Sequence, residues 1–185
     1  MLNWLKRNYF IVLLVASIVA LSLTIVPIYN LIDLISNSSS DEYKTSLWMS
    51  LVYYVGLGLA EVVFIIIASR RSLDKKFIIL AILLYFVSDI AVSVYRLIAN
   101  QSYTAIYSIA INAALIIFMI LSLSDRRYFF TTLIILLIDA APALLGTFSG
   151  SEIDFSALLL DFMLLSAIYF FGASDQSNTD YNYYS

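Results

Sequence analysis

The chain has 185 residues, of which 62% are hydrophobic and only 12% are charged, and its formal net charge is −3. A soluble domain of this size has no core large enough for so much apolar surface, so the composition indicates a protein that lipid surrounds. Cysteine and histidine are absent, which excludes Cys/His zinc sites, thiol nucleophiles, His-based triads and disulfide bonds. The lack of a basic run argues against nucleic-acid binding.

Six apolar stretches are long enough for a hydrocarbon core of about 30 Å, which a helix crosses in about 20 residues. The first is too long for the apolar part of a signal peptide, so we expect it to stay as a transmembrane helix. The six expected helices are 9–31, 46–69, 76–98, 103–123, 128–148 and 155–173. The predicted fold class is therefore all-α: a polytopic membrane domain over 1–173, followed by a polar cytosolic tail at 174–185 that we expect to be disordered.

The basic residues predict how the chain is oriented in the membrane. Eight of the ten Lys and Arg residues fall on one side of the expected bundle, and only Lys44 and Arg96 fall on the other. Because Lys and Arg resist translocation, the richer side is expected to be cytoplasmic, and six crossings put both termini there. The composition is typical of an AT-rich microbial genome, so we expect a multi-pass protein of a microbial cell membrane.

The cytosolic ends of the even-numbered expected helices resemble one another, at 66–71, 123–127 and 172–175. Each following helix opens with a base and an aromatic residue. This pattern predicts three consecutive helical hairpins in the same orientation. The small alphabet of membrane sequences explains the resemblance equally well.

Five polar residues share one depth in this frame, about 13 to 21 Å from the cytosolic ends. They are Glu61, Asp89, Asn112, Asp139 and Asp161. A charge at a helix centre costs roughly 2.5 to 3.5 kcal/mol, and no base is expected at this depth, since Arg96 lies two turns outward of Asp89. Burial and crowding favour the neutral form of some of these acids, which is the form that a general acid or a proton carrier needs.

Helical spacing puts Tyr85 on the same face as Asp89, with Ser88 beside it. These acids are candidates for proton transfer or acid catalysis, and we expect no metal and no cofactor. The expected binding residues are Glu61, Asn112, Asp161, Tyr85 and Ser88. The alternative is that these groups pair with one another and with hydroxyls to hold the helices together.

The two acids also carry a family resemblance. Asp89 follows Ser88 and precedes Asn112 by 23 residues, and Asp139 precedes Asp161 by 22. This arrangement, over residues 76–173, resembles the lysoplasmalogenase-like (YhhN) membrane family. The resemblance implies acid-catalysed cleavage of the vinyl-ether bond of lysoplasmalogens by Asp89 and Asp139. The chain departs from the family in having six expected helices rather than eight, no histidine, and Ser88 where glycine is common.

Three functions remain open at this point. The first is a membrane hydrolase of an ether lipid or related amphiphile. The second is a transporter of protons, small cations or small solutes, or the membrane subunit of one. The third is a non-catalytic subunit of a membrane complex. The expected partners are the lipid bilayer, a lipid-like or small polar substrate, and a second protein or copy of the chain. Five glycines and two prolines argue mildly against a transporter with broken helices.

Overall fold

A computed structural model describes residues 2–101, 103–147 and 154–182, with side chains over 8–99, 101, 103–141 and 154–172. Within these ranges the chain is helical and contains no strand. Its helices are α1 (Leu2–Asn37), α2 (Asp41–Arg70), α3 (Lys75–Asn100), α4 (Thr104–Ser122), α5 (Tyr128–Thr147) and α6 (Phe155–Asn182). Each expected helix therefore has a counterpart in the described part of the chain.

Five of these helices are long and apolar enough to cross a membrane: α1, α2, α3, α4 and α6. The apolar stretch described for α5 covers Tyr128–Ala141 and is shorter. The predicted class, a helical integral membrane protein, is confirmed at this level.

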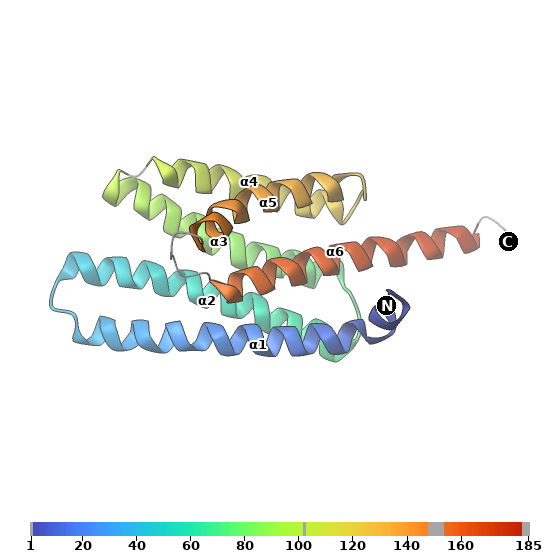
Figure 1. The fold of residues 1–185 in the computed structure, drawn as a ribbon, viewed down its shortest axis with the longest axis horizontal. Helices are drawn as coiled ribbons and strands as arrows, with labels where there is room; N and C mark the ends of the chain where they lie inside the picture. Colours follow the sequence, from blue (N-terminus) through green and yellow to red (C-terminus); the bar gives the residue numbers. More distant parts are fainter. Residues whose placement is uncertain (1, 102, 148–153, 183–185) are drawn as a thin grey trace.

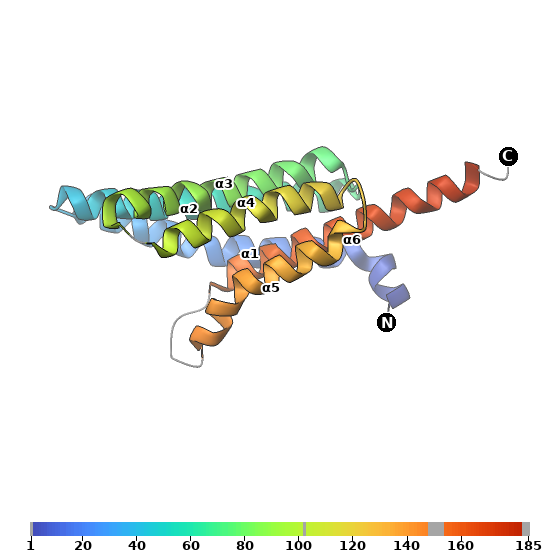
Figure 2. The same cartoon turned by 90° about the horizontal axis from the view of Figure 1, so that it is seen from above.

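Helix α6 contacts each of the other five helices, whereas α5, within the described residues, contacts α4 and α6. Helices α2 and α3 pack directly against each other, and Figure 2 shows α5 and α6 on one side of the layer that α2, α3 and α4 form. Figures 1 and 2 show the start of α1 and the end of α6 at the same end of the bundle. The α6 side chains that point inward are fully or almost fully buried: Leu160, Met163, Leu164, Ala167 and Ile168. Any polar group on this face of α6 must therefore find its partners inside the protein.

Short polar residues mark where the helices begin. Asp74 caps α3, because its carboxylate accepts a hydrogen bond from the backbone N–H of Lys76 at 2.9 Å. Asp154 stands directly before α6 and accepts in the same way from the N–H of Ser156 at 3.1 Å. Ser40 caps α2. These caps determine the residue at which each of the three helices begins.

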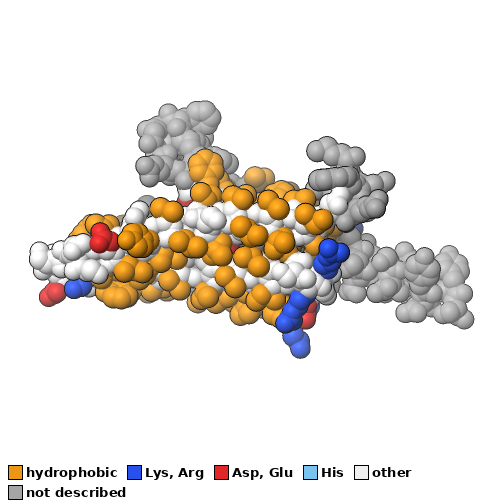
Figure 3. Space-filling model, turned by 90° about the horizontal axis from the view of Figure 1, so that it is seen from below, with side chains coloured by type: hydrophobic (Ala, Val, Ile, Leu, Met, Phe, Trp, Pro, Cys, Tyr) orange, Lys and Arg blue, Asp and Glu red, His pale blue; other side chains and the backbone are white. Residues whose placement is uncertain are grey.

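Apolar side chains form the outer surface. Figure 3 shows that hydrophobic side chains cover the middle of the visible face, while charged side chains gather at its two ends. Large apolar residues that stay exposed are found on all six helices, including Ile11, Val15, Val52, Leu80, Val87, Ile117, Ile134 and Phe162. Such a band needs lipid around it rather than water.

Helix α6 continues beyond its apolar segment to Asn182. Figure 1 shows its last turns projecting past the other helices. The structure therefore describes helix over most of the stretch for which we expect disorder. An unpacked helical extension of this length is only marginally stable in water, so the disordered tail stays a prediction.

Candidate functional site

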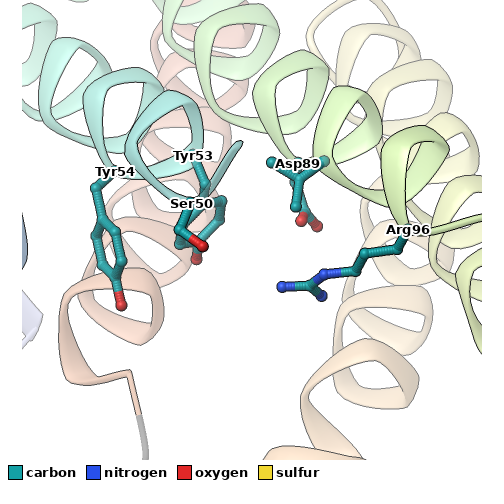
Figure 4. A pocket seen from close by; sticks show the side chains of 6 residues that line it. Ser50, Tyr53, Tyr54, Asp89 and Arg96 are labelled. Atoms are coloured by element: carbon teal, nitrogen blue, oxygen red, sulfur yellow. The ribbon is translucent and has the colours of Figure 1, made fainter. Parts of the chain in front are cut away.

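A polar pocket of about 320 Å³ opens between α2 and α3. This volume is large enough for a small molecule or a lipid headgroup. Figure 4 shows Arg96 extending from α3 toward α2, so that its guanidinium group lies in the space into which Asp89 also points. We call this space the α2–α3 pocket, and its lining residues are Ser50, Tyr53, Tyr54, Asp89, Val92 and Arg96.

The carboxyl group of Asp89 is hydrogen-bonded to a residue of α4, the other neighbour of α3. The Nδ2 atom of Asn112 on α4 donates a hydrogen bond to its Oδ2 atom at 2.6 Å. Asn112 also donates to Ser108 Oγ at 3.3 Å, and that oxygen accepts from Ser93 Oγ at 3.0 Å. Because Asp89 also interacts electrostatically with Arg96, the carboxyl group has a donor on one side and a cation on the other. The predicted pair of Asp89 and Asn112 is thus brought together.

Three of the predicted acids form a cluster of carboxyl groups. Asp139 on α5 interacts electrostatically with Asp89, and Asp161 on α6 interacts with both. Asp161 is buried, with 7% of its side chain exposed. Asp154, at the start of α6, also interacts with Asp161. The cluster therefore involves three helices, and Asp89 is its member in the lining of the α2–α3 pocket.

Tyr85 belongs to this cluster. It is buried, interacts electrostatically with Asp89 and Asp161, and its ring centroid lies 6.3 Å from that of Tyr53 in the pocket lining. Tyr53 interacts with the same two acids. Two phenol groups, one of them in the pocket lining, thus interact with the carboxyl cluster.

Ser88 lies in a helix contact rather than in the pocket lining. Its Oγ atom donates to the backbone carbonyl of Tyr85 at 2.7 Å. A Cβ atom built on Gly56 would lie 2.2 Å from that Oγ and 2.8 Å from the carbonyl oxygen of Leu84. Only a glycine at position 56 allows α2 and α3 to approach this closely, because any side chain would collide with Ser88 and with backbone.

Glu61 is separate from the other acids. It is fully buried between α1 and α2, where Thr24 Oγ1 lies 2.9 Å from its Oε1 atom. None of Asp89, Asp139 and Asp161 is among its electrostatic partners, which include Asp154 alone among the acids. The expected layer of five groups is therefore divided into a pocket cluster and a separate α1–α2 site, and Asp154 interacts with both.

Several residues of the site had not been predicted to belong to it: Arg96, Ser50, Tyr53, Tyr54 and Val92 in the pocket lining, and Asp154 beside Asp161. Arg96 shares a helical face with Asp89, and this was the available signal. Over the described ranges, no group of three or more acidic, Cys or His side chains is arranged to hold a metal ion.

No family model matches the chain, and no match is found among the curated proteins or the solved structures.

Proposed function

We propose that the protein crosses the membrane six times, as three hairpins with both termini in the cytoplasm, and that the α2–α3 pocket opens toward the opposite side. Two features support this orientation. The basic pairs Arg70–Arg71 and Arg126–Arg127 lie at the ends of α2 and α4 that adjoin the end of α6. Ser50 and Arg96, in contrast, line the pocket near the start of α2 and the end of α3.

Within this frame, the site best fits a hydrolase that acts on an ether lipid by acid catalysis. One observation carries the proposal: a carboxyl group, Asp89, faces an open polar pocket while interacting with a second carboxyl, Asp139, and with a guanidinium, Arg96. Arg96 lies seven residues beyond Asp89 on α3, which is about 10 Å along the helix. An amphiphile with an anionic headgroup and a reactive bond below it matches this spacing.

The chemistry requires one proton donor and one proton acceptor. As a carboxylic acid, Asp89 would give its proton to the β-carbon of a vinyl ether, which leaves an oxocarbenium ion. Water would add to the cationic carbon and lose a proton to a carboxylate of the Asp89–Asp139 pair. The resulting hemiacetal breaks into an aldehyde and an alcohol. The reaction consumes one water molecule and restores both acids to their starting state.

The test is aldehyde release from a lysoplasmalogen by the purified protein. We expect release by the unchanged chain and its loss in Asp89→Asn and in Asp139→Asn. A suitable control is Asp33→Asn, because Asp33 is exposed near the far end of α1 and does not line the pocket. Failure of the unchanged chain to release aldehyde, or release that persists in both pocket variants, removes the hydrolase.

A second candidate function is transport of protons or small cations. The cluster supports it, because carboxyl groups continue from Asp89 in the pocket to Asp161 on α6. Beyond Asp161 the core is apolar, with Leu164, Ile168 and Met119 fully or almost fully buried. Transport therefore requires a conformation that opens this core. Acid-driven flux in proteoliposomes that is lost in Asp161→Asn would favour this function, whereas flux that survives Asp161→Asn and Glu61→Gln argues against it.

A further inference from the structure

Glu61 is a buried acid that the proposed hydrolysis does not use. It lies in the middle of α2 and none of its side chain is exposed. Among the described residues, its Oε2 atom has no hydrogen-bond partner, and its Oε1 atom has the hydroxyl of Thr24 as a partner. The two helices are close at this level, since a Cβ atom on Gly58 would lie 3.5 Å from Thr24 Cγ2. No polar pocket described above includes Glu61.

Counting hydrogens at Thr24 shows which form of Glu61 fits. Thr24 Oγ1 lies 2.9 Å from Glu61 Oε1 and 3.1 Å from the backbone carbonyl oxygen of Ala20. A hydroxyl has one hydrogen, so it cannot donate fully to both acceptors. If Glu61 is ionised, a buried carboxylate shares a single donor with a carbonyl, and Oε2 has none.

A proton on Oε1 removes the conflict. Glu61 then donates to Thr24 Oγ1, and Thr24 donates to the carbonyl oxygen of Ala20. Every hydrogen in this chain of contacts has an acceptor, and only a neutral carbonyl oxygen, Oε2, stays without a donor. An unpaired neutral acceptor is far less unfavourable in a buried site than an unpaired charge.

Among the described residues, no positive charge near Glu61 could balance an ionised carboxylate. The charged group that faces it from α6 is Asp154, which is itself an acid. The contacts from α1 are made by the neutral Thr24. No lysine or arginine of the described residues is among the electrostatic partners of Glu61.

We infer that Glu61 is a proton-binding site, distinct from the α2–α3 pocket, which holds a proton at neutral pH and links α2 to α1 through Thr24 and the Ala20 carbonyl. The ligand is the proton itself. Removal of the proton breaks this link and leaves a carboxylate between two packed helices, so the α1–α2 contact depends on protonation. The inference does not depend on the proposed hydrolysis.

Infrared spectroscopy can test the protonation state directly. The chain has three glutamates, Glu42, Glu61 and Glu152, so a ¹³C label in the glutamate carboxyl groups reports on few sites. In the Glu42→Gln/Glu152→Gln background, Glu61 carries the only label. We expect the isotope-shifted band of a neutral carboxylic acid at pH 7, with a further shift in D₂O if the site exchanges. A label found wholly in carboxylate bands at pH 7 overturns the inference.

Thermal unfolding in detergent gives an independent test. Glutamine mimics the neutral acid and can donate from its amide to Thr24 Oγ1. We therefore expect Glu61→Gln to change Tm by less than about 2 °C, whereas Thr24→Val, which cuts the chain of contacts, lowers Tm by about 2–4 °C. If Glu61→Gln lowers Tm as much as Thr24→Val, the carboxylate form is the native one and the inference fails. If Glu61→Gln does not fold, the labelled chain with native Glu61 still decides the question.

Discussion

Asn112 on α4 donates a hydrogen bond of 2.6 Å to Asp89 on α3, and it does so from a buried position outside the lining of the α2–α3 pocket. The carboxyl group that faces the pocket is thus oriented by a residue that a bound molecule need not touch. Replacing Asn112 therefore separates the positioning of Asp89 from its chemistry.

The first prediction concerns this bond. Asn112→Leu removes the donor and leaves Asp89 with one acceptor unpaired, so we expect the free energy of unfolding to fall by about 0.5–2 kcal/mol. We expect aldehyde release to fall as well. Unfolding in detergent measures the first effect, and Ser108→Ala is the control, since Ser108 lies 3.3 Å from Asn112 and does not contact Asp89. Equal losses in the two variants would show that Asn112 acts only as part of the general polar packing.

The second prediction compares two glycines on α2. Gly56→Ala places a Cβ atom 2.2 Å from Ser88 Oγ and 2.8 Å from the carbonyl oxygen of Leu84, so the helices must separate. We expect a loss of stability of about 1–3 kcal/mol. Gly58→Ala meets its nearest atom, Thr24 Cγ2, at 3.5 Å, and we expect it to be neutral or stabilising by up to about 1 kcal/mol. Unfolding of the two variants in the same detergent measures both changes in stability.

A second substitution at Ser88 distinguishes the collision between position 56 and Ser88 from a general effect of replacing a glycine. Adding Ser88→Gly to Gly56→Ala removes the two nearest atoms and should restore part of the lost stability. No recovery would mean that the backbone of α3, rather than Ser88, sets the distance between the helices.

The third prediction concerns the cation of the pocket. Arg96→Gln removes the only Lys or Arg side chain among the described residues that line the α2–α3 pocket. If a substrate phosphate binds there, KM should rise about 10- to 100-fold with a smaller change in kcat. Lys44→Gln, the other basic residue expected on this side, is the control and should leave KM unchanged. A fall in kcat with no change in KM would assign Arg96 to positioning Asp89 instead.

The fourth prediction tests the number of crossings. Because the chain has no cysteine, single cysteines can be introduced without altering the background. Ser39→Cys should react with a membrane-impermeant maleimide from outside intact cells, whereas Ser72→Cys should react only after permeabilisation. Ser151→Cys decides between six and fewer crossings, and it lies outside the described residues. Labelling of Ser151→Cys from outside supports six, and its protection until the cells are opened contradicts the third hairpin.

The helices were predictable because apolar runs of sufficient length end at polar residues such as Ser40 and Asp74. The pairing of Asp89 with Asn112 followed from their matching depths in neighbouring helices. Depth does not determine which way a side chain faces within the bundle, however. Glu61 shares the depth of Asp89 but points into the α1–α2 contact.

The direction and reach of side chains also explain the other differences between the predicted and the observed site. Ser88 is next to Asp89 in the sequence, yet one step along a helix turns a side chain by about 100°, and this rotation directs Ser88 at Gly56. Arg96 lies two turns from Asp89, but its long side chain reaches into the same pocket. Neither the rotation of α3 against α2 nor the reach of a flexible side chain can be obtained from one sequence.

The length of α1 makes the protein sensitive to the thickness of its membrane. The part of α1 from Asn8 to Asn37 has 30 residues and so measures about 45 Å, and the apolar segment 9–31 within it measures about 35 Å, against a hydrocarbon core of about 30 Å. The helix must tilt or project, and this hydrophobic mismatch changes with the lipid chain length. Because Thr24 lies on α1 and Glu61 on α2, a tilt of α1 against its neighbour strains the contact that carries the buried proton. The thickness of the bilayer should therefore change the fraction of Glu61 that is protonated, although the side chain of Glu61 is not exposed to solvent.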